Sequence, residues 1–376
     1  MTRKQFLQTL QLGVYSFLFG KFNFSTSIAS PQKKGIKNWL WLHPWNNISD
    51  DEYKKRFDKI KESGIDAILP NIYGSWRALY TSQHLPYAEP LLEKLLPFAK
   101  SSGLEVHAWM WTMICNIENI LEKHPNWFAV NRNGESTIEK PAYVNYYRFM
   151  CPNNIEVQEF ITKTVTELSN YSELTGVHLD YVRYPDVILA ERLQKKYDIV
   201  QDKEYPEYDY CYCETCKKLF KDESGIDISK DENAETKILW KQFRYDSLTK
   251  FINNKLIPAA KKKNKVITAA VFPNWENVRQ QWSKWNLDGV HPMLYNDFYN
   301  ENVEWIVKNI IKGKQSLNSA TKLFSGLMVD SFDPREFKTT ITKAIEANAD
   351  GVSLFAYHSM KDGHWESLKE LTKSSQ

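Results

Sequence analysis

Short apolar runs alternate with amphipathic segments along most of the chain. Between the first two runs, Ser49 has the pattern of a helix N-cap, acids follow it, and Tyr53, Phe57 and Ile60 recur at helical spacing. The same order of apolar run and amphipathic segment returns further along the chain. The apolar runs, which we interpret as strands, are Ile36–His43, Ile65–Ile72, Leu104–Trp111, Val177–Val182, Val266–Phe272, Leu287–Tyr295, Leu323–Val329 and Gly351–Tyr357.

Eight alternations of strand and helix predict an α/β fold, a (β/α)8 TIM barrel, in a single domain over residues 35–376. An open doubly wound sheet is the alternative, but no Gly-rich phosphate-binding turn follows an early run. The connections at residues 115–149 and 185–239 are longer than a barrel requires. We therefore expect long insertions at the C-terminal face, where such barrels bind substrates.

The composition is that of a globular protein rich in aromatic residues. Of 376 residues, 14% are aromatic, including 13 Trp and 20 Tyr, which favours stacking platforms for a partly apolar ligand. The formal net charge of +3 gives no electrostatic reason to expect a nucleic-acid partner. Nothing in the sequence calls for a redox or nucleotide cofactor.

The first thirty residues have the pattern of an export signal. Arg3 and Lys4 precede a largely apolar run at Leu10–Phe19, and small residues follow at Ser27 and Ala29. The run is shorter than the roughly 20 residues of a membrane span. We expect a Sec or twin-arginine-like signal peptide over residues 1–30, export to the periplasm or beyond, and no transmembrane segment in the mature chain. The alternative is an amphipathic N-terminal helix.

The fourth run carries the first candidate catalytic residue, Asp180. By strand alternation His178 and Asp180 share a face. A buried acid needs a partner, and we expect His178 or Arg183 to pair with Asp180 and keep it ionised. An ionised carboxylate suits a nucleophile or charge stabiliser in glycosidic cleavage. The alternative is an aspartate that fixes a loop through Arg183.

A glycosidase needs a second carboxyl group to protonate the leaving oxygen. In the sixth run, alternation places Tyr295 and Asp297 on one face. After the fifth run, Glu276 stands beside Trp275, and apolar packing would raise its pKa as a general acid requires. The sequence does not decide between the two, although parity favours Asp297. A retaining outcome is the default expectation.

Residues at the other strand ends match the edges and faces of a pyranose, which presents hydroxyl groups and C–H groups. The candidate substrate-binding residues are Trp41, His43, Tyr73, Trp76, Arg77, His107, Trp109, Trp111, His178, Arg183, Trp275, His291, Tyr295, Asp330, Tyr357 and His358. Many of these aromatic residues are equally compatible with the core.

Four segments carry a resemblance to a known family. His178–Pro185, Pro292–Tyr295, Ser325–Met328 and Gly351–Phe355 together resemble the bacterial glycosyl-hydrolase-like barrels known as family-10-like glycosylhydrolases. The resemblance implies a (β/α)8 fold, a location outside the cytoplasm and hydrolysis of a polysaccharide or glycan. Carried over by position, it also implies Asp180 as nucleophile and an acid after the sixth strand at residue 297.

Three of the five cysteines cluster within the second long connection, at Cys211, Cys213 and Cys216. Such closely spaced thiols favour a structural zinc ion away from Asp180, with a fourth ligand from elsewhere, such as Cys151 or a histidine. The alternative is a disulfide between two of them, which leaves one thiol free, and Cys115 and Cys151 fit small buried hydrophobic residues better than ligands.

Two other function classes remain open. Five histidines lie in or just after the predicted strands, which is compatible with a metal-dependent amidohydrolase-type barrel, although the first run lacks the paired histidines of such sites. They are His43, His107, His178, His291 and His358. The other class is a non-catalytic barrel that binds a glycan without cleaving it.

Overall fold

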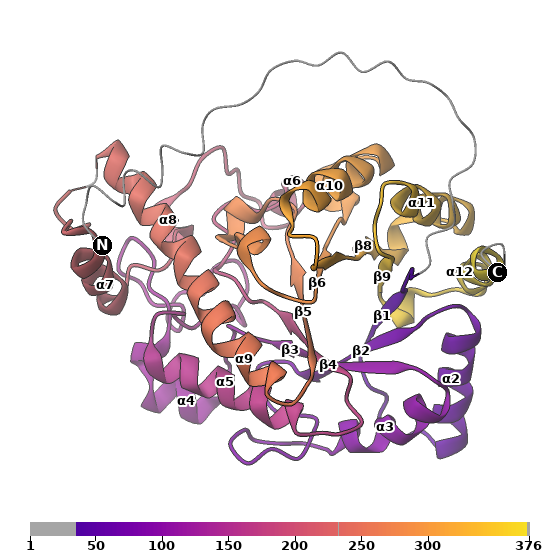
Figure 1. The fold of residues 1–376 in the computed structure, drawn as a ribbon. Coiled ribbons are helices and arrows are strands. Elements are labelled where there is room, and N and C mark those ends of the chain that lie inside the picture. Colours follow the sequence, from indigo (N-terminus) through magenta and orange to yellow (C-terminus); the bar gives the residue numbers. More distant parts are fainter. Residues whose placement is uncertain (1–34, 232, 374–376) are drawn as a thin grey trace.

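Parallel strands form a nearly closed barrel, with helices packed around it (Figure 1). The computed structural model describes residues 35–231 and 233–373. Its strands are β1 (Trp39–Leu42), β2 (Ala67–Tyr73), β3 (Glu105–Trp111), β4 (Gly176–Asp180), β5 (Val266–Val271), β6 (Gly289–Pro292), β7 (Lys322–Leu323), β8 (Ser325–Met328) and β9 (Val352–Phe355). The predicted TIM-barrel fold is therefore confirmed. The expected signal peptide lies outside the described residues.

The seventh predicted run is divided into β7 and β8, which pair with different neighbours. β7 pairs with β6, while β8 pairs with β9, which in turn pairs with β1. A parallel bridge between Met293 and Gly326 joins the two ends of the sheet, and the Leu294 N–H donates to the Gly326 carbonyl at 2.9 Å. A Cβ at position 326 would lie 2.6 Å from the Pro292 carbonyl oxygen, so this close approach requires glycine.

The helices follow the amphipathic segments of the sequence. In the first of them, the Ser49 hydroxyl accepts a hydrogen bond from the Glu52 N–H, and Tyr53, Phe57 and Ile60 are buried, as predicted. A π-helical stretch at 252–256 joins two later helices. The helices are α2 (Asp50–Glu62), α3 (Leu91–Ser101), α4 (Glu118–Lys123), α5 (Ile155–Ser169), α6 (Glu191–Lys196), α7 (Glu214–Ser224), α8 (Ala234–Phe251), α9 (Ile257–Lys261), α10 (Val303–Ser316), α11 (Pro334–Glu346) and α12 (Asp362–Lys373). No helix among the described residues is both long enough and apolar enough to span a bilayer.

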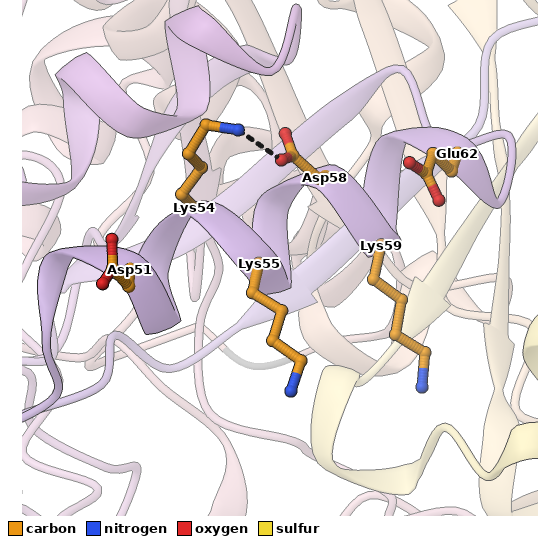
Figure 2. A pocket seen from close by; sticks show the side chains of 6 residues that line it. All are labelled: Asp51, Lys54, Lys55, Asp58, Lys59 and Glu62. Carbon is orange, nitrogen blue, oxygen red and sulfur yellow. Dashed lines mark hydrogen bonds and ion pairs between the residues drawn. The ribbon is translucent and has the colours of Figure 1, made fainter.

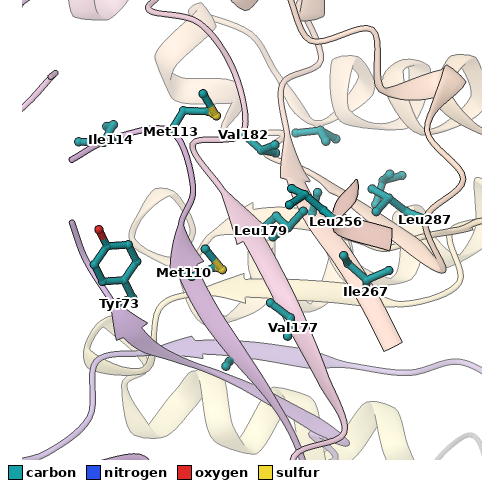
Figure 3. Close-up of a cluster of buried hydrophobic side chains, with 14 of the residues drawn as sticks. Tyr73, Met110, Met113, Ile114, Val177, Leu179, Val182, Leu256, Ile267 and Leu287 are labelled. Carbon is teal, nitrogen blue, oxygen red and sulfur yellow. The ribbon is translucent and has the colours of Figure 1, made fainter. Parts of the chain in front are cut away.

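Strand alternation divides the apolar side chains between two layers. Met110, Val177, Leu179 and Ile267 belong to the larger cluster, which also includes residues of the surrounding helices (Figure 3). The opposite faces of the strands fill the barrel interior. That smaller interior cluster consists of Trp39, Trp41, Ala67, Leu69, Trp109, Ala270, Phe324 and Ala356.

Three histidines lie fully buried among the aromatic rings of this interior. The ring of Trp39 lies 4.5 Å from that of His107 and 4.8 Å from that of His291, and the rings of His178 and His291 are 4.8 Å apart. Burial lowers the pKa of each of the three histidines below 6.5. Neutral imidazoles therefore form part of the barrel core.

Two long segments connect strands to helices on the C-terminal side. Residues 112–154 lie between β3 and α5 and contain α4, and residues 181–233 lie between β4 and α8 and contain α6 and α7. The segments pack on each other, since the rings of Tyr143 and Tyr208 stack at 4.6 Å. Their position brings both segments next to the ends of β3 and β4.

A shallow depression lies along the outer face of α2 (Figure 2). It is lined only by charged side chains of this helix, and one ion pair, Lys54 to Asp58 at 2.9 Å, crosses it. Exposed ion pairs of this kind are ordinary features of a solvated helix. The depression therefore carries no functional argument. Its lining residues are Asp51, Lys54, Lys55, Asp58, Lys59 and Glu62.

Candidate active site

Asp180 is the last residue of β4, and its side chain lies on the interior side of the barrel. We call the end of the barrel where the strands have their C-terminal ends the mouth. Its carboxylate accepts a hydrogen bond from Trp109 Nε1 at 2.9 Å and from the Tyr181 N–H at 2.7 Å. Tyr181 has a φ of 49°, so the chain turns directly after the acid. These contacts hold the side chain of the half-buried Asp180 at the mouth.

Burial raises the pKa of Asp180 to about 6, although the Tyr181 N–H, the Trp109 indole and the charge of Arg183 act in the opposite direction. We expected His178 or Arg183 to pair with Asp180 and keep it ionised, but its hydrogen bonds come from Trp109 and the Tyr181 N–H, and Arg183 acts on it only through its charge. His178 lies one layer deeper in the barrel, where its Nδ1 contacts the Thr268 hydroxyl at 2.9 Å.

Arg183 is buried, and its hydrogen bonds go to the loop that follows Asp180. Its guanidinium donates to Asp186 at 2.8 Å and to the Tyr184 carbonyl at 2.9 Å. The rings of Phe272 and Tyr181 lie 4.7 and 5.2 Å from it. Arg183 therefore fixes the loop that follows Asp180, and its partner in this is Asp186.

Four aromatic side chains form a wall beside Asp180, which we call the aromatic wall: Trp76, Trp111, Tyr146 and Tyr181. Trp111 lies directly opposite Asp180 in the β3–β4 register. Its ring is 4.7 Å from that of Tyr181, 5.7 Å from that of Tyr146 and 6.3 Å from that of Trp76. Trp76 is 47% exposed, so the wall offers an accessible apolar face. Such a face suits the C–H side of a sugar ring.

Predicted residues that follow β1, β6 and β9 lie near Trp109 and Asp180 or contact one another. The ring of His43 lies 5.2 Å from that of Trp109 and 6.5 Å from that of His358, and both histidines are exposed. Burial and the neighbouring His358 lower the pKa of His43. Tyr295 packs on Phe355 at 5.9 Å and lies within electrostatic range of Asp180. The structure thus brings Tyr295 near Asp180 and His43 against Trp109, with His358 beside His43.

Several predicted site residues lie away from Asp180. Trp41, His107, His178 and His291 are fully buried deeper in the barrel. Tyr73 is also buried, and it belongs to the outer core because the strand register shifts between Asn71 and Tyr73.

Other predicted residues lie around the rim or on the outer side. The ring of Tyr357 packs on that of Trp45 at 4.8 Å. The ring of Trp275 packs on that of Tyr245 of α8 at 5.1 Å. Trp275 also lines a cavity that lies between α10 and the ends of β5 and β6. Arg77 is exposed in the loop after β2. Asp330 is exposed after β8 and accepts a 2.5 Å hydrogen bond from Ser359.

The two candidates for the second carboxyl group lie on the rim. The expected strand alternation does not reach Asp297, because β6 ends at Pro292 and Asp297 stands in a 3-10 turn. Its carboxylate is 3.5 Å from Arg192 and 41% exposed. Glu276 is exposed in another 3-10 turn. Among the described residues, the groups that shift the pKa of Asp180 do not include a second carboxyl group.

Asn71 is a candidate that sequence reasoning missed. It lies opposite Trp109 in the β2–β3 register, on the face that Ala67 and Leu69 turn to the barrel interior. Its buried Nδ2 has no hydrogen-bond partner in the described part of the chain. A lone amide within an apolar strand was the available signal. Asn71 is therefore a candidate for binding a ligand hydroxyl beside Trp109.

The histidines do not form the cluster that an amidohydrolase-type barrel requires. His43 and His358 lie at the mouth, whereas the other three form the buried interior layer. In the interior, one nitrogen of His291 contacts the Ser353 hydroxyl and one of His107 contacts Glu105. Between residues 35 and 373, residue 232 excepted, the side chains that gather closely enough to hold one metal ion are four cysteines.

Comparison with known sequences decides the family. The sequence model of the glycosyl hydrolase-like 10 family matches residues 48–317. The chain belongs to this family. The glycosyl hydrolase-like 10 chain is also similar to "Glycosyl hydrolase YngK" of Bacillus subtilis (strain 168), at 25% identity over 185 residues. That match covers 43% of this chain and 32%, about a third, of the relative.

Solved structures share the fold of this glycosyl hydrolase-like 10 chain. The glycoside hydrolase domain of PgaB (BpsB) from Bordetella bronchiseptica matches with a TM-score of 0.70 at 12% identity, over 89% of this chain and 98% of that domain. The catalytic domain of a β-amylase from Paenibacillus polymyxa matches with a TM-score of 0.62 at 11% identity, over 91% and 99% of the two chains. At these identities the likeness concerns the barrel alone.

Proposed function

We propose that this glycosyl hydrolase-like 10 chain is a glycoside hydrolase that cleaves a polysaccharide or glycan, with Asp180 as its central catalytic residue. One observation carries the proposal: the half-buried Asp180 at the barrel mouth is held by Trp109 beside an aromatic wall. Active sites of (β/α)8 enzymes lie at this face. Aromatic planes next to a carboxyl group match the needs of glycosidic cleavage.

The surroundings of Asp180 favour a proton-transfer role. Its pKa of about 6 is higher than that of an ordinary aspartate, and the cause is burial without a direct cationic partner. A carboxyl group with a pKa near the working pH both gives and accepts protons efficiently. We therefore propose Asp180 as general acid/base, in place of the nucleophile that the sequence suggested.

The proposed two-carboxylate mechanism requires a nucleophile or a base opposite Asp180. Asp297 and Glu276 are the candidates. Each lies in a 3-10 turn that begins four residues after a barrel strand ends, after β6 for Asp297 and after β5 for Glu276. Asp297→Asn and Glu276→Gln variants distinguish them, because loss of the true partner removes turnover while substrate binding persists. The retaining outcome is part of the proposal, and proton NMR of the first anomer released tests it.

A panel of plant, algal and bacterial-wall glycans tests the proposed function. The purified chain is incubated with each glycan, and the release of reducing ends is measured over time. We expect at least one glycan to yield new reducing ends. No release from any member of a broad panel, by a folded protein, would contradict the proposal.

A non-catalytic glycan-binding barrel is the second candidate function. It is favoured because, among the described residues, the groups that shift the pKa of Asp180 do not include a second carboxyl group. Affinity electrophoresis on the same panel separates the two functions. Retention by a glycan without release of reducing ends supports binding alone, whereas retention with release supports hydrolysis.

Export is also part of the proposed function, and it rests on Arg3, Lys4 and the apolar run at Leu10–Phe19. Cell fractionation tests it, with the protein expected outside the cytoplasm and shortened by about thirty residues at its N-terminus. An uncleaved cytoplasmic protein would contradict it.

A further inference from the structure

We propose that Cys151, Cys211, Cys213 and Cys216 bind one structural zinc ion that ties the β3–α5 and β4–α8 segments together. The Sγ atoms of the four residues all lie within 4.8 Å of one another. Cys151 Sγ is 3.4 Å from that of Cys216 and 3.5 Å from that of Cys213. Four sulfur atoms around zinc, at Zn–S distances of about 2.3 Å, lie about 3.8 Å apart.

The same distances are too long for a disulfide, whose sulfur atoms lie about 2.05 Å apart. All four cysteines are free in the structure. Four thiols that point at a common centre, rather than two pairs at bonding distance, have the arrangement of a tetrahedral site. Among divalent metal ions without redox chemistry, a set of four thiolates favours zinc.

Polar hydrogens around the sulfur atoms provide independent support. The Val130 N–H points at Cys211 Sγ at 3.4 Å, and Asn153 Nδ2 points at Cys216 Sγ at 3.2 Å. Hydrogen bonds of this kind stabilise thiolates and orient metal ligands. Both donors come from the β3–α5 segment, which also carries Cys151, and their sulfur acceptors lie in the β4–α8 segment, so these hydrogen bonds also join the two segments.

The ligands come from parts of the chain that are distant in sequence. Cys151 and Cys216 are 65 residues apart, and they lie just before α5 and in the first turn of α7. Four protein ligands leave no open position for a substrate, which is the pattern of a structural site. The ion would therefore hold together two segments that flank the ends of β3 and β4, where Trp109 and Asp180 stand. This inference is independent of the proposed hydrolase activity.

Metal analysis of the purified full chain tests the proposal. We expect one zinc ion per chain in the wild type, full retention in Cys115→Ser and loss of most of the zinc in Cys151→Ser. Cys115 is the matched control, because it is a buried cysteine outside the group of four. Equal zinc contents in the two variants, or no zinc in the wild type, would overturn the proposal.

Two measurements on the wild type keep the test independent of how well a variant folds. Titration with a mercurial reagent, followed with a chromogenic chelator, is expected to release one zinc as four thiols react. Cobalt(II) exchanged into the site is expected to show the intense absorption of a tetrahedral thiolate complex. A chain whose mass shows disulfides among these cysteines, or that holds iron instead of zinc, would overturn the assignment.

Discussion

The indole N–H of Trp109 donates to the carboxylate of Asp180 diagonally across the β3–β4 pair, because Trp109 stands opposite His178 in the register and Asp180 stands two residues further on. The hydrogen bond orients the acid towards the mouth. It also favours the ionised form of Asp180, against the burial that raises the pKa.

Removing this donor is expected to shift the pH dependence of catalysis. In Trp109→Phe the pKa of Asp180 rises above its value of about 6, because the ionised form loses a hydrogen bond. A hydrogen bond to a charged group contributes about 1.5 kcal/mol, so its loss raises the pKa of Asp180 by about one unit. If Asp180 acts as the acid, the alkaline limb of kcat/KM moves up by that amount. Trp39→Phe, in the deeper interior, is the control whose limb stays in place.

Asn71→Ala is expected to weaken substrate recognition while the fold is kept. The buried amide nitrogen has no hydrogen-bond partner among the described residues, so removing it breaks no hydrogen bond there. Loss of one neutral hydrogen bond to the substrate lowers kcat/KM about 3- to 10-fold. The exposed Asn119→Ala of α4 is the control. Equal kinetics in both variants would show that Asn71 does not contact the substrate.

The buried histidines predict a loss of stability in mild acid. The pKa values of His178 and His291 are lowered from 6.5 by burial, so the unfolded state binds more protons below that pH. The contribution of the neutral histidines to the free energy of unfolding is fully present above about pH 6.5. It is lost as the pH falls below that value, with a slope of up to about 1.4 kcal/mol per pH unit for each histidine. Urea unfolding between pH 7.5 and 5.5 measures the slope. It is expected to be shallower in His178→Asn than in His358→Asn, and identical slopes would contradict this account.

Asp186→Ala is expected to destabilise the chain by about 3–5 kcal/mol, because it leaves the buried Arg183 guanidinium without its partner. Chemical denaturation measures the loss. Replacing both residues, as Arg183→Met with Asp186→Ala, should recover much of it. The exposed pair Lys218 and Asp222 is the control, since Asp222→Ala should have little effect. A small loss in Asp186→Ala would show that the pair does not anchor the loop.

The apolar periodicity was sufficient to predict the barrel, because each strand and its helix carry a local pattern. It also placed Asp180 on the interior face, where it lies with His178 on the opposite side from Leu179. The partner of Asp180 could not be predicted, since the Trp109 contact depends on the register between two strands. Tyr73 was misplaced because an irregularity after Asn71 interrupts the alternation. The gathering of Cys151 with the later cysteines likewise depends on how two distant segments pack.

The turnover of Asp180→Asn on a glycan that the wild type cleaves tests the central proposal most directly. The amide keeps the size of the side chain but can no longer donate or accept the catalytic proton. The control is Asp362→Asn, because Asp362 has an exposed side chain at the start of α12. We expect kcat to fall by about 100-fold or more in Asp180→Asn, with glycan retention preserved. Turnover equal to that of the control would contradict a catalytic role for Asp180.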